Sequence, residues 1–259
     1  MKKIYLLIWA IVGIMFIFTQ ISLYTEKIEM TELHESSVAE SYDISRITPL
    51  IKEKEEDDKE DEIEEEINNK ENVIAYTPHL QINHERLKKE NSDYIGWIYI
   101  PDTKISYPIV KGPNNDYYLH RTFERKSAYA GSIFIDSFSE NGLDQKNVIL
   151  YGHNMKNGTM FGTLKQYRDK EFFLNHPYIE VYTEEKFYLY EIFAAREVSS
   201  DINTLNYQLD NFEIDEYISN AKNTSIHFKE NLTGSQIITL STCMNNDALR
   251  FIINGIRIY

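Results

Sequence analysis

The chain has 259 residues, of which 42% are hydrophobic and 13% aromatic. A chain of this length can bury one domain of up to about 200 residues and still carry appended segments. The formal net charge of −14 argues against nucleic-acid binding, because contact with a phosphate backbone requires a basic face. The single cysteine excludes an intramolecular disulfide framework and any multi-cysteine metal cage.

Residues 4–23 form an uncharged, hydrophobic run that follows two lysines. A helix of this length rises about 30 Å, which matches the hydrocarbon core of a bilayer. Lysines favour the cytoplasmic side of a membrane, so we predict a cytoplasmic N-terminus at residues 1–3 and an extracellular location for everything after the span. A cleaved signal peptide is the alternative, but its hydrophobic region is shorter, and no small-x-small cleavage site occurs at residues 19–25.

Residues 24–78 have no sustained apolar period and carry most of the net negative charge of the chain. Within them, residues 51–71 hold 12 Asp or Glu against 4 Lys. Charges of one sign at this density repel each other in any compact form. We therefore predict a disordered, extracellular stalk over residues 24–78, which holds the folded domain of residues 79–259 away from the membrane.

The domain alternates short β-type runs with turn residues. Helices are expected at residues 81–93, 159–175 and 214–224, where polar and apolar residues alternate at helical spacing. The β-type runs are rich in Ile, Val, Tyr and Phe. Eight such runs occur, at residues 96–100, 105–110, 131–136, 147–151, 178–182, 186–198, 236–242 and 249–259. Eight strands with few helices predict a mostly β domain, either a sandwich or a closed barrel.

Cys243 ends one of these runs, at a strand end where a side chain reaches the mouth of a cleft. Outside a membrane an unpaired thiol oxidises unless it is retained for its reactivity, which favours a nucleophile. An inert, buried thiol is the alternative, because free cysteine is among the most buried residue types. The residue pattern supports both interpretations equally.

A catalytic thiol needs a proton partner and a group that stabilises the oxyanion formed on attack. Among the seven histidines, His153 ends a strand run and His120 follows the segment DYYL, so these two are the candidates for the proton partner. The other five are expected in the stalk, at the start of the domain or in loops: His34, His79, His84, His176 and His227. Any one histidine is more often structural than catalytic.

The position of Arg250 follows from a hairpin between the last two strand runs. If residues 236–242 and 249–259 pair, the linker returns Arg250 to the end of the sheet that carries Cys243. A guanidinium at that position directs fixed donors at a developing oxyanion. The alternative is an ion pair between Arg250 and a carboxylate such as Asp247.

Three segments carry these candidate groups: residues 151–155 (YGHNM), 239–243 (TLSTC) and 250–255 (RFIING). They resemble the catalytic-histidine segment, the nucleophile signature and the arginine-led final strand of the class B sortases, cell-wall cysteine transpeptidases of Gram-positive bacteria. Supporting similarities occur at residues 95–101, 115–120, 130–136, 160–164 and 176–178. The likeness therefore extends over the domain from Leu80 to Tyr259.

The resemblance implies a closed eight-stranded β-barrel with N-terminal helices and a helix before the cysteine strand. It also implies that Cys243 is the nucleophile, His153 the general acid/base, and Arg250 the stabiliser of substrate and oxyanion. His120 is then structural, and no metal or organic cofactor is needed.

The resemblance further implies the partners of the reaction. Ser241 and Leu119 occupy positions where family members contact the sorting signal. The thiol attacks a sorting motif of a secreted surface protein to form a thioester, which an amine of peptidoglycan or a pilin lysine resolves. The enzyme is expected at the cell membrane, single-pass, with its catalytic domain outside.

Three other hypotheses compete with a transpeptidase. A cysteine peptidase would release the acyl group to water instead of to an amine. A tethered extracellular binding domain would carry Cys243 as an inert thiol. A Cys/His metal site is disfavoured, because only one thiolate is available.

Overall fold

The computed structural model describes residues 51–53, 76–199, 213–243 and 249–259, all of which belong to one compact unit. The segments predicted as cytoplasmic N-terminus and membrane anchor, residues 1–23, lie outside this part, and so does most of the predicted stalk. None of the helices in the described ranges is long and apolar enough to cross a membrane.

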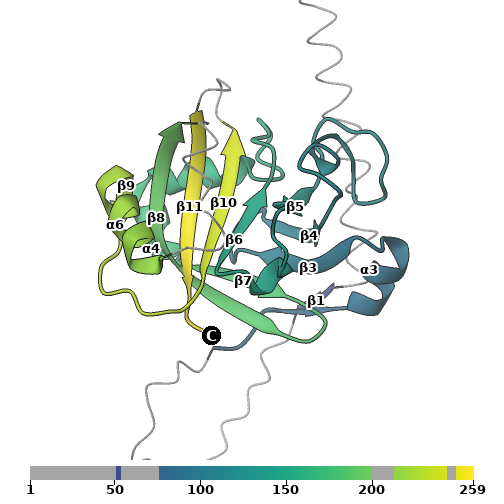
Figure 1. Cartoon of the computed structure of the whole chain (residues 1–259), viewed down its shortest axis with the longest axis horizontal. Coiled ribbons are helices and arrows are strands. Elements are labelled where there is room, and N and C mark those ends of the chain that lie inside the picture. Colours follow the sequence, from purple (N-terminus) through teal and green to yellow (C-terminus); the bar gives the residue numbers. More distant parts are fainter. Residues whose placement is uncertain (1–50, 54–75, 200–212, 244–248) are drawn as a thin grey trace, which may run out of the picture. The chain divides into compact units, whose positions relative to one another are not determined.

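Eight strands close into a barrel (Figure 1). Their order around the barrel is β11 (Leu249–Arg257), β10 (Ile237–Cys243), β6 (Asn147–Tyr151), β5 (Ile133–Ile135), β4 (Ser106–Val110), β3 (Tyr94–Tyr99), β7 (Tyr178–Tyr182) and β8 (Phe187–Ser199). β8 pairs with β11 and so closes the ring. The predicted mostly β, eight-stranded closed barrel is confirmed.

All eight predicted runs are strands, and the bounds of β6 and β7 match the prediction. A strand that the sequence pattern missed, β9 (Ser225–Phe228), pairs with the second half of β8, beyond the part that pairs with β7. β9 directly follows a helix and has two apolar residues only, so no local pattern marks it as a strand. It forms because β8 offers an edge for pairing.

The helix α6 (Ile214–Thr224) lies where it was predicted. The first predicted helix is shorter: α3 (His84–Glu90) begins after Asn83, whose side-chain oxygen accepts a hydrogen bond from the Arg86 N–H at 3.0 Å. This cap ends the preceding strand β2 (Leu80–Ile82), which the helix prediction had included in part.

The helix predicted at residues 159–175 divides in two, a 3₁₀ helix η4 (Gly162–Arg168) and α4 (Lys170–Asn175). Asp169 between them has an extended backbone, and its side chain accepts a hydrogen bond from the Phe172 N–H at 2.9 Å. An aspartate that caps a new helix interrupts the one before it.

A buried carboxylate joins the segment before β2 to the barrel. Glu180 on β7 is fully buried and accepts hydrogen bonds from the Tyr76 hydroxyl at 2.6 Å and from the His79 N–H at 3.3 Å. The imidazole of His79 and the hydroxyl of Tyr182 also contact it. The contact of Tyr76 with Glu180 lies before residue 79, where the domain was predicted to begin. A short strand inside the predicted stalk, β1 (Ile51–Glu53), pairs antiparallel with β2.

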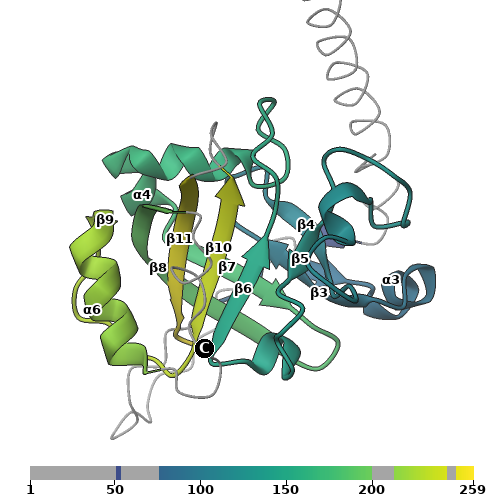
Figure 2. The ribbon, with the colours of Figure 1, turned by 45° about the horizontal axis from the view of Figure 1, so that its top comes forward.

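The strands β6, β10 and β11 define two ends of the barrel. β6 and β10 run parallel, and β11 runs antiparallel to β10. The last residues of β6 and β10 and the first residues of β11 therefore lie together, at the end where the arrowheads of β6 and β10 point in Figures 1 and 2. The C-terminus lies at the opposite end (Figure 1).

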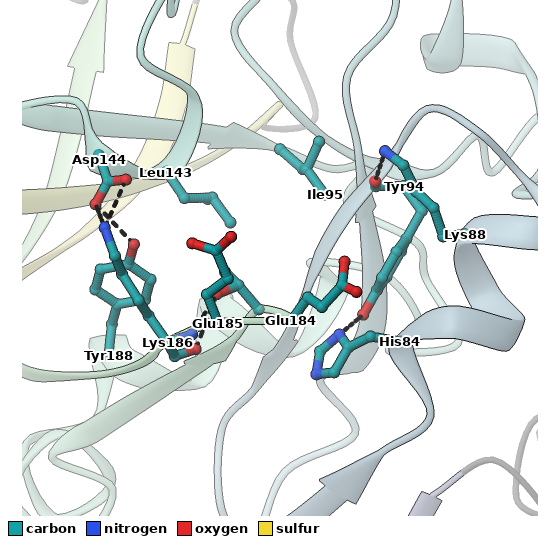
Figure 3. Close-up of a pocket in the computed structure, with 11 residues that line it drawn as sticks. His84, Lys88, Tyr94, Ile95, Leu143, Asp144, Glu184, Glu185, Lys186 and Tyr188 are labelled. Carbon is teal, nitrogen blue, oxygen red and sulfur yellow. Dashed lines mark hydrogen bonds and ion pairs between the residues drawn. The ribbon is translucent and has the colours of Figure 1, made fainter.

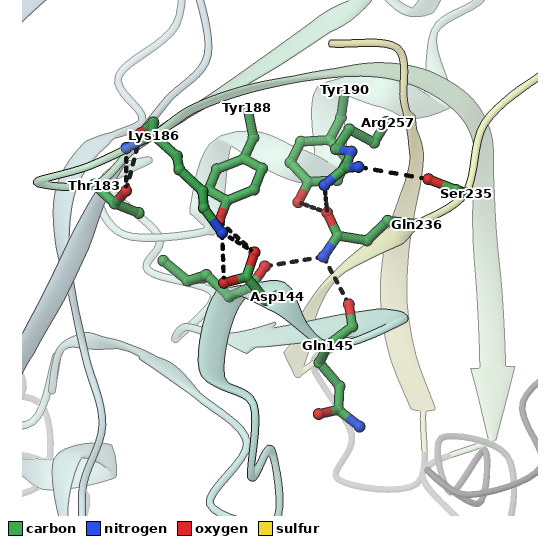
Figure 4. Close-up of polar contacts among 10 residues, drawn as sticks. Asp144, Gln145, Thr183, Lys186, Tyr188, Tyr190, Ser235, Gln236 and Arg257 are labelled. Atoms are coloured by element: carbon green, nitrogen blue, oxygen red, sulfur yellow. Dashed lines mark hydrogen bonds and ion pairs between the residues drawn. The ribbon is translucent and has the colours of Figure 1, made fainter.

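That opposite end is held by a hydrogen-bonded group that we call the Gln236 cluster (Figure 4). The buried Gln236 amide donates to the carbonyl oxygens of Leu143 at 2.9 Å and Gln145 at 2.7 Å. Its Oε1 accepts from the Tyr190 hydroxyl at 2.8 Å and from Arg257 at 3.4 Å. One side chain thus joins β8, β11 and the segment before β6 where β10 begins.

Candidate active site

Cys243 and Arg250 are opposite residues in the antiparallel pair of β10 and β11. Opposite residues in such a pair have Cα atoms about 4.5–5.5 Å apart. The structure describes Cys243 by its backbone, which lies beside the predicted oxyanion stabiliser as the hairpin argument required. Asp247, the alternative partner of Arg250, lies outside the described residues.

His153 lies level with Cys243 across the neighbouring strand pair. β6 is parallel to β10, with Tyr151 opposite Ser241. The Gly152 N–H donates to the Ser241 carbonyl at 3.3 Å, so the pairing continues beyond the strand end. Parallel strands advance equally along their length, which brings residue 153 to the level of residue 243. The three predicted catalytic residues therefore meet at one end of the barrel.

The orientation of the His153 ring is set by a backbone carbonyl. His153 Nε2 lies 2.8 Å from the carbonyl oxygen of Leu119. A carbonyl only accepts hydrogen bonds, so Nε2 carries the proton and Nδ1 holds the lone pair of the neutral ring. Gly131 permits this arrangement: its φ is +60°, and a Cβ there would lie 2.4 Å from the Leu119 oxygen.

The surroundings of His153 favour its neutral form. Burial lowers the pKa of His153 below its ordinary value, because a buried imidazolium loses its hydration. The hydrogen bond to Leu119 opposes this effect in part. His120 and Arg250 lower the pKa further, since positive charge on either repels a proton on His153. A neutral imidazole with an unprotonated Nδ1 is suited to accept a proton from a thiol.

Two exposed rings lie beside His153. The Tyr129 ring stacks on His153 at 5.3 Å between centroids, and the His120 ring stacks at 5.6 Å. Sequence reasoning placed no role on Tyr129, because a tyrosine before an Ala-Gly pair carries no pattern of its own. His120, assigned a structural role by the resemblance, is in contact with the predicted acid/base.

Ser241 lies on β10, two residues before Cys243. It is 1% exposed, and within the described part of the chain its hydroxyl has no hydrogen-bond partner. Beside it, Val198 and Ile252 pack with Tyr151 as an apolar cluster. An unpaired buried hydroxyl beside apolar side chains is able to bind a polar group of a ligand. Leu119, the other predicted substrate contact, is part of η2 (Tyr118–His120). Unlike Ser241, it has an apolar side chain, which packs against a buried hydrophobic cluster.

A second network holds Tyr151. Its hydroxyl donates to Asp136 Oδ2 at 2.8 Å, and the Asn115 amide donates to the same oxygen at 3.2 Å. Burial raises the pKa of the Tyr151 phenol, Asp136 raises it further, and the charge of Arg250 opposes both. Tyr151 is therefore held as a neutral phenol near Arg250.

Sequence reasoning also missed a buried cation on β8. Arg196 is 2% exposed and lies opposite Ile252, two residues before the Val198–Arg250 pair. Its Nε and Nη1 have no hydrogen-bond partner among the residues described, and its guanidinium lies 5.7 Å from the Tyr217 ring centroid. A single arginine within an apolar strand shows no spacing that would have revealed it.

A cavity of about 270 Å³ lies far from these residues (Figure 3). It is bounded by α3, by the turn between β7 and β8, and by η3 (Gly142–Asp144), at the end of the barrel that holds the Gln236 cluster. None of the predicted site residues lines it. In the described ranges no group of three or more His, Cys, Asp or Glu side chains is placed to hold a metal ion. That the reaction needs no cofactor stays a prediction.

A closed β-barrel whose cysteine strand ends beside an arginine and a histidine is the arrangement that the resemblance to the sortases implies. The family model of the sortase domain matches residues 98–257. This chain therefore belongs to the sortase family, and its relatives place it in class B.

Two curated relatives are sortase B proteins. Sortase B of Listeria monocytogenes is 40% identical over 160 residues, which cover 61% of this chain and 65% of that protein. Sortase B of Staphylococcus aureus is 32% identical over 174 residues, covering 66% and 71%. The match to the Listeria protein thus spans just under two thirds of its length.

Solved structures agree with this assignment. The X-ray structure of Clostridium perfringens sortase B is similar with a TM-score of 0.61 and 31% identity, covering 68% of this chain and 99% of that one. A Staphylococcus aureus sortase B–substrate complex gives a TM-score of 0.61 and 31% identity, covering 68% and 84%.

Proposed function

We propose that this protein is a membrane-anchored class B sortase that cleaves a sorting motif of secreted surface proteins and joins the acyl fragment to an amine. The observation that carries the proposal is the strand register. It brings Cys243, Arg250 and His153 from three strands to one end of the barrel.

In the first half of the reaction, the Cys243 thiol attacks the scissile carbonyl of the motif. A free thiol with a pKa near 8.5 is only a few per cent ionised at neutral pH, so it needs a base. His153 accepts the thiol proton at Nδ1, because Nε2 is committed to the Leu119 carbonyl. Arg250 donates hydrogen bonds to the oxyanion. His153 then gives its proton to the leaving amine, the C–N bond breaks, and a thioester remains.

In the second half, an acceptor amine attacks the thioester. His153 takes a proton from the amine, an amide bond forms, and the thiol leaves and is protonated again. We propose an amine of peptidoglycan, or a pilin lysine, as the acceptor. Solved sortase B structures in complex with a substrate and with triglycine support a peptide donor and an amine acceptor.

We further propose that Ser241 and Leu119 contact the sorting peptide. The buried, unpaired hydroxyl of Ser241 supports the first contact. The membrane location is supported by the hydrophobic run at residues 4–23 and the two lysines before it. Digestion of intact cells by an added protease tests it: an extracellular domain is degraded, and a cytoplasmic domain survives.

The function is tested with the full chain in detergent micelles. Fluorogenic sorting-type pentapeptides are incubated with and without a small amine, and wild type is compared with Cys243→Ala. We expect cysteine-dependent cleavage, a thioester that can be trapped, and capture of the product by the amine. Cleavage without capture would identify a peptidase. No cleavage, together with a thiol inert to alkylating reagents, would favour a tethered binding domain.

A further inference from the structure

His153 shares its ring contacts with a second imidazole. The His120 and His153 rings are 5.6 Å apart between centroids and inclined by 28°. Tyr129 completes the group, at 5.3 Å and 14° from His153 and at 6.5 Å and 30° from His120. His120 and Tyr129 are exposed, whereas His153 is partly buried. The acid/base therefore lies against an imidazole that is in contact with solvent.

Among the side chains that the structure describes, the charged groups that act on His153 are positive. Arg250 acts on it from β11 and His120 from η2, while Leu119 contributes a carbonyl oxygen. None of these groups is a carboxylate, and a tyrosine such as Tyr129 carries no charge at neutral pH. Arg250 is charged at every physiological pH, whereas an imidazole is the side chain whose charge changes in that range. His120 is therefore the group among the described side chains whose charge can change the field at His153, and the proposed nucleophile Cys243 is a second ionisable group at this end of the barrel.

We propose that His120 is a positioning residue for the transpeptidation reaction: it stacks on the His153 ring and, when it is protonated, disfavours the proton on His153. The effect on catalysis rests on the proposed role of His153, but the effect on the His153 proton does not. A positive charge on an imidazole stacked at this distance disfavours a second positive charge on the ring of His153. His153 consequently remains neutral to a lower pH than it would alone.

The test is a set of variants that differ in charge at one position. Full-length protein labelled with ¹⁵N-histidine in detergent micelles is titrated by NMR as wild type, His120→Lys, His120→Gln and His120→Glu. We expect the pKa of His153 to be lowest in the Lys variant, higher in the Gln variant and highest in the Glu variant. The two extremes should differ by roughly one pH unit at low salt, and by less at high salt.

Two controls separate charge from shape. His120→Phe keeps a flat ring without a charge, so His153 should titrate in it as in the Gln variant. His227→Gln removes a histidine on β9 that contacts neither ring, and it should leave His153 unchanged. Equal His153 titration in the Lys, Gln and Glu variants would overturn the proposal.

The kinetic readout is the pH dependence of kcat/KM with the peptide and amine. The limb of the pH profile that reports the ionisation of His153 should shift, from variant to variant, in the same order as the His153 pKa values measured by NMR. A merely structural role of His120 would instead lower kcat/KM by one factor at every pH in all four variants. If the wild type cleaves no peptide, the proposed function fails, and the NMR titration still decides the role of His120.

Discussion

The two ends of β10 differ in how its buried polar side chains are paired. At one end the Gln236 cluster satisfies buried donors and acceptors with side-chain and backbone partners. At the other end the buried hydroxyls of Ser241 and Thr242 have no hydrogen-bond partner in the described part of the chain. Unpaired buried groups cost stability, and these two hydroxyls lie at the end of the barrel where we propose that the substrate binds.

The two ends are separated by the length of β10 alone, seven residues or about 23 Å. The hydrogen bonds of the Gln236 cluster support one end of the strands, so the opposite strand ends can carry reactive groups that contribute little to folding. The following variants test this division, from the largest expected effect to the smallest.

Two arginines on β11 provide a matched pair. Arg250→Ala at the catalytic end should lower kcat/KM by about 10² to 10³, because it removes an oxyanion donor, and change stability little. Arg257→Ala at the Gln236 cluster should leave kcat/KM within about twofold and lower the unfolding free energy by about 1 kcal/mol, through lost contacts to Gln236 and Tyr188. Kinetics and urea denaturation of both variants are the measurements. Equal activity losses would remove the distinction between the ends.

Gln236→Ala should be the most destabilising of these variants. It leaves the Leu143 and Gln145 carbonyls and the Tyr190 hydroxyl without their partner in a buried site. We expect a loss of about 2 to 3 kcal/mol in unfolding free energy. Below its melting temperature the variant should retain the wild-type kcat. A drop in kcat at full folding would show that the two ends are coupled.

Two hydroxyls on β10, two residues apart, sharpen the comparison. The Thr239 hydroxyl bonds Asn147 and Asn254, so Thr239→Val should cost about 1 to 2 kcal/mol of stability. Ser241→Ala removes a hydroxyl without a described partner and should change stability by less than about 0.5 kcal/mol. Its effect should appear as a higher KM for the sorting peptide. An unchanged KM would contradict the proposed substrate contact.

The smallest effect is expected at the exposed pair of Lys186 and Asp144 (Figure 4). Hydrogen bonding from the Lys186 ammonium lowers the pKa of Asp144, burial opposes this in part, and the Tyr188 hydroxyl lowers the pKa further. A carboxyl whose pKa is lower in the folded state stabilises the fold at any pH above its unfolded pKa of about 3.9. This stabilisation is lost as the pH falls through the folded pKa.

Asp144→Asn should therefore lower stability by less than about 1 kcal/mol near neutral pH, because solvent screens the exposed pair. At a pH below both the folded and the unfolded pKa of Asp144, wild type and variant should unfold at the same urea concentration. Lys186→Met is the control, since it removes the same ion pair by replacing the cation instead of the carboxylate. A stability difference that persists at low pH would assign the effect to packing instead.

The sequence by itself determined the eight barrel strands and the catalytic candidates. Strand runs are local patterns of β-branched and aromatic residues, and they need no knowledge of their neighbours. Cys243, His153 and Arg250 each stand near the end of such a run, and the predicted hairpin of the last two runs brings Arg250 to Cys243. The parallel pairing of β6 with β10, which brings His153 to the same end, was not predicted. The positions of the first and second helices were predicted less well, because the caps at Asn83 and Asp169 divide continuous polar–apolar patterns.

Only the tertiary structure decided what surrounds those candidates. The Leu119 carbonyl that orients His153 is 34 residues away in the chain, and it approaches through the positive φ of Gly131. The stacking of His120 on His153, the pairing of β9 with β8, and the burial of Arg196 depend in the same way on the path of distant segments. Such contacts leave no local period in a sequence, because they are made by chain closure and not by the repeat of one element.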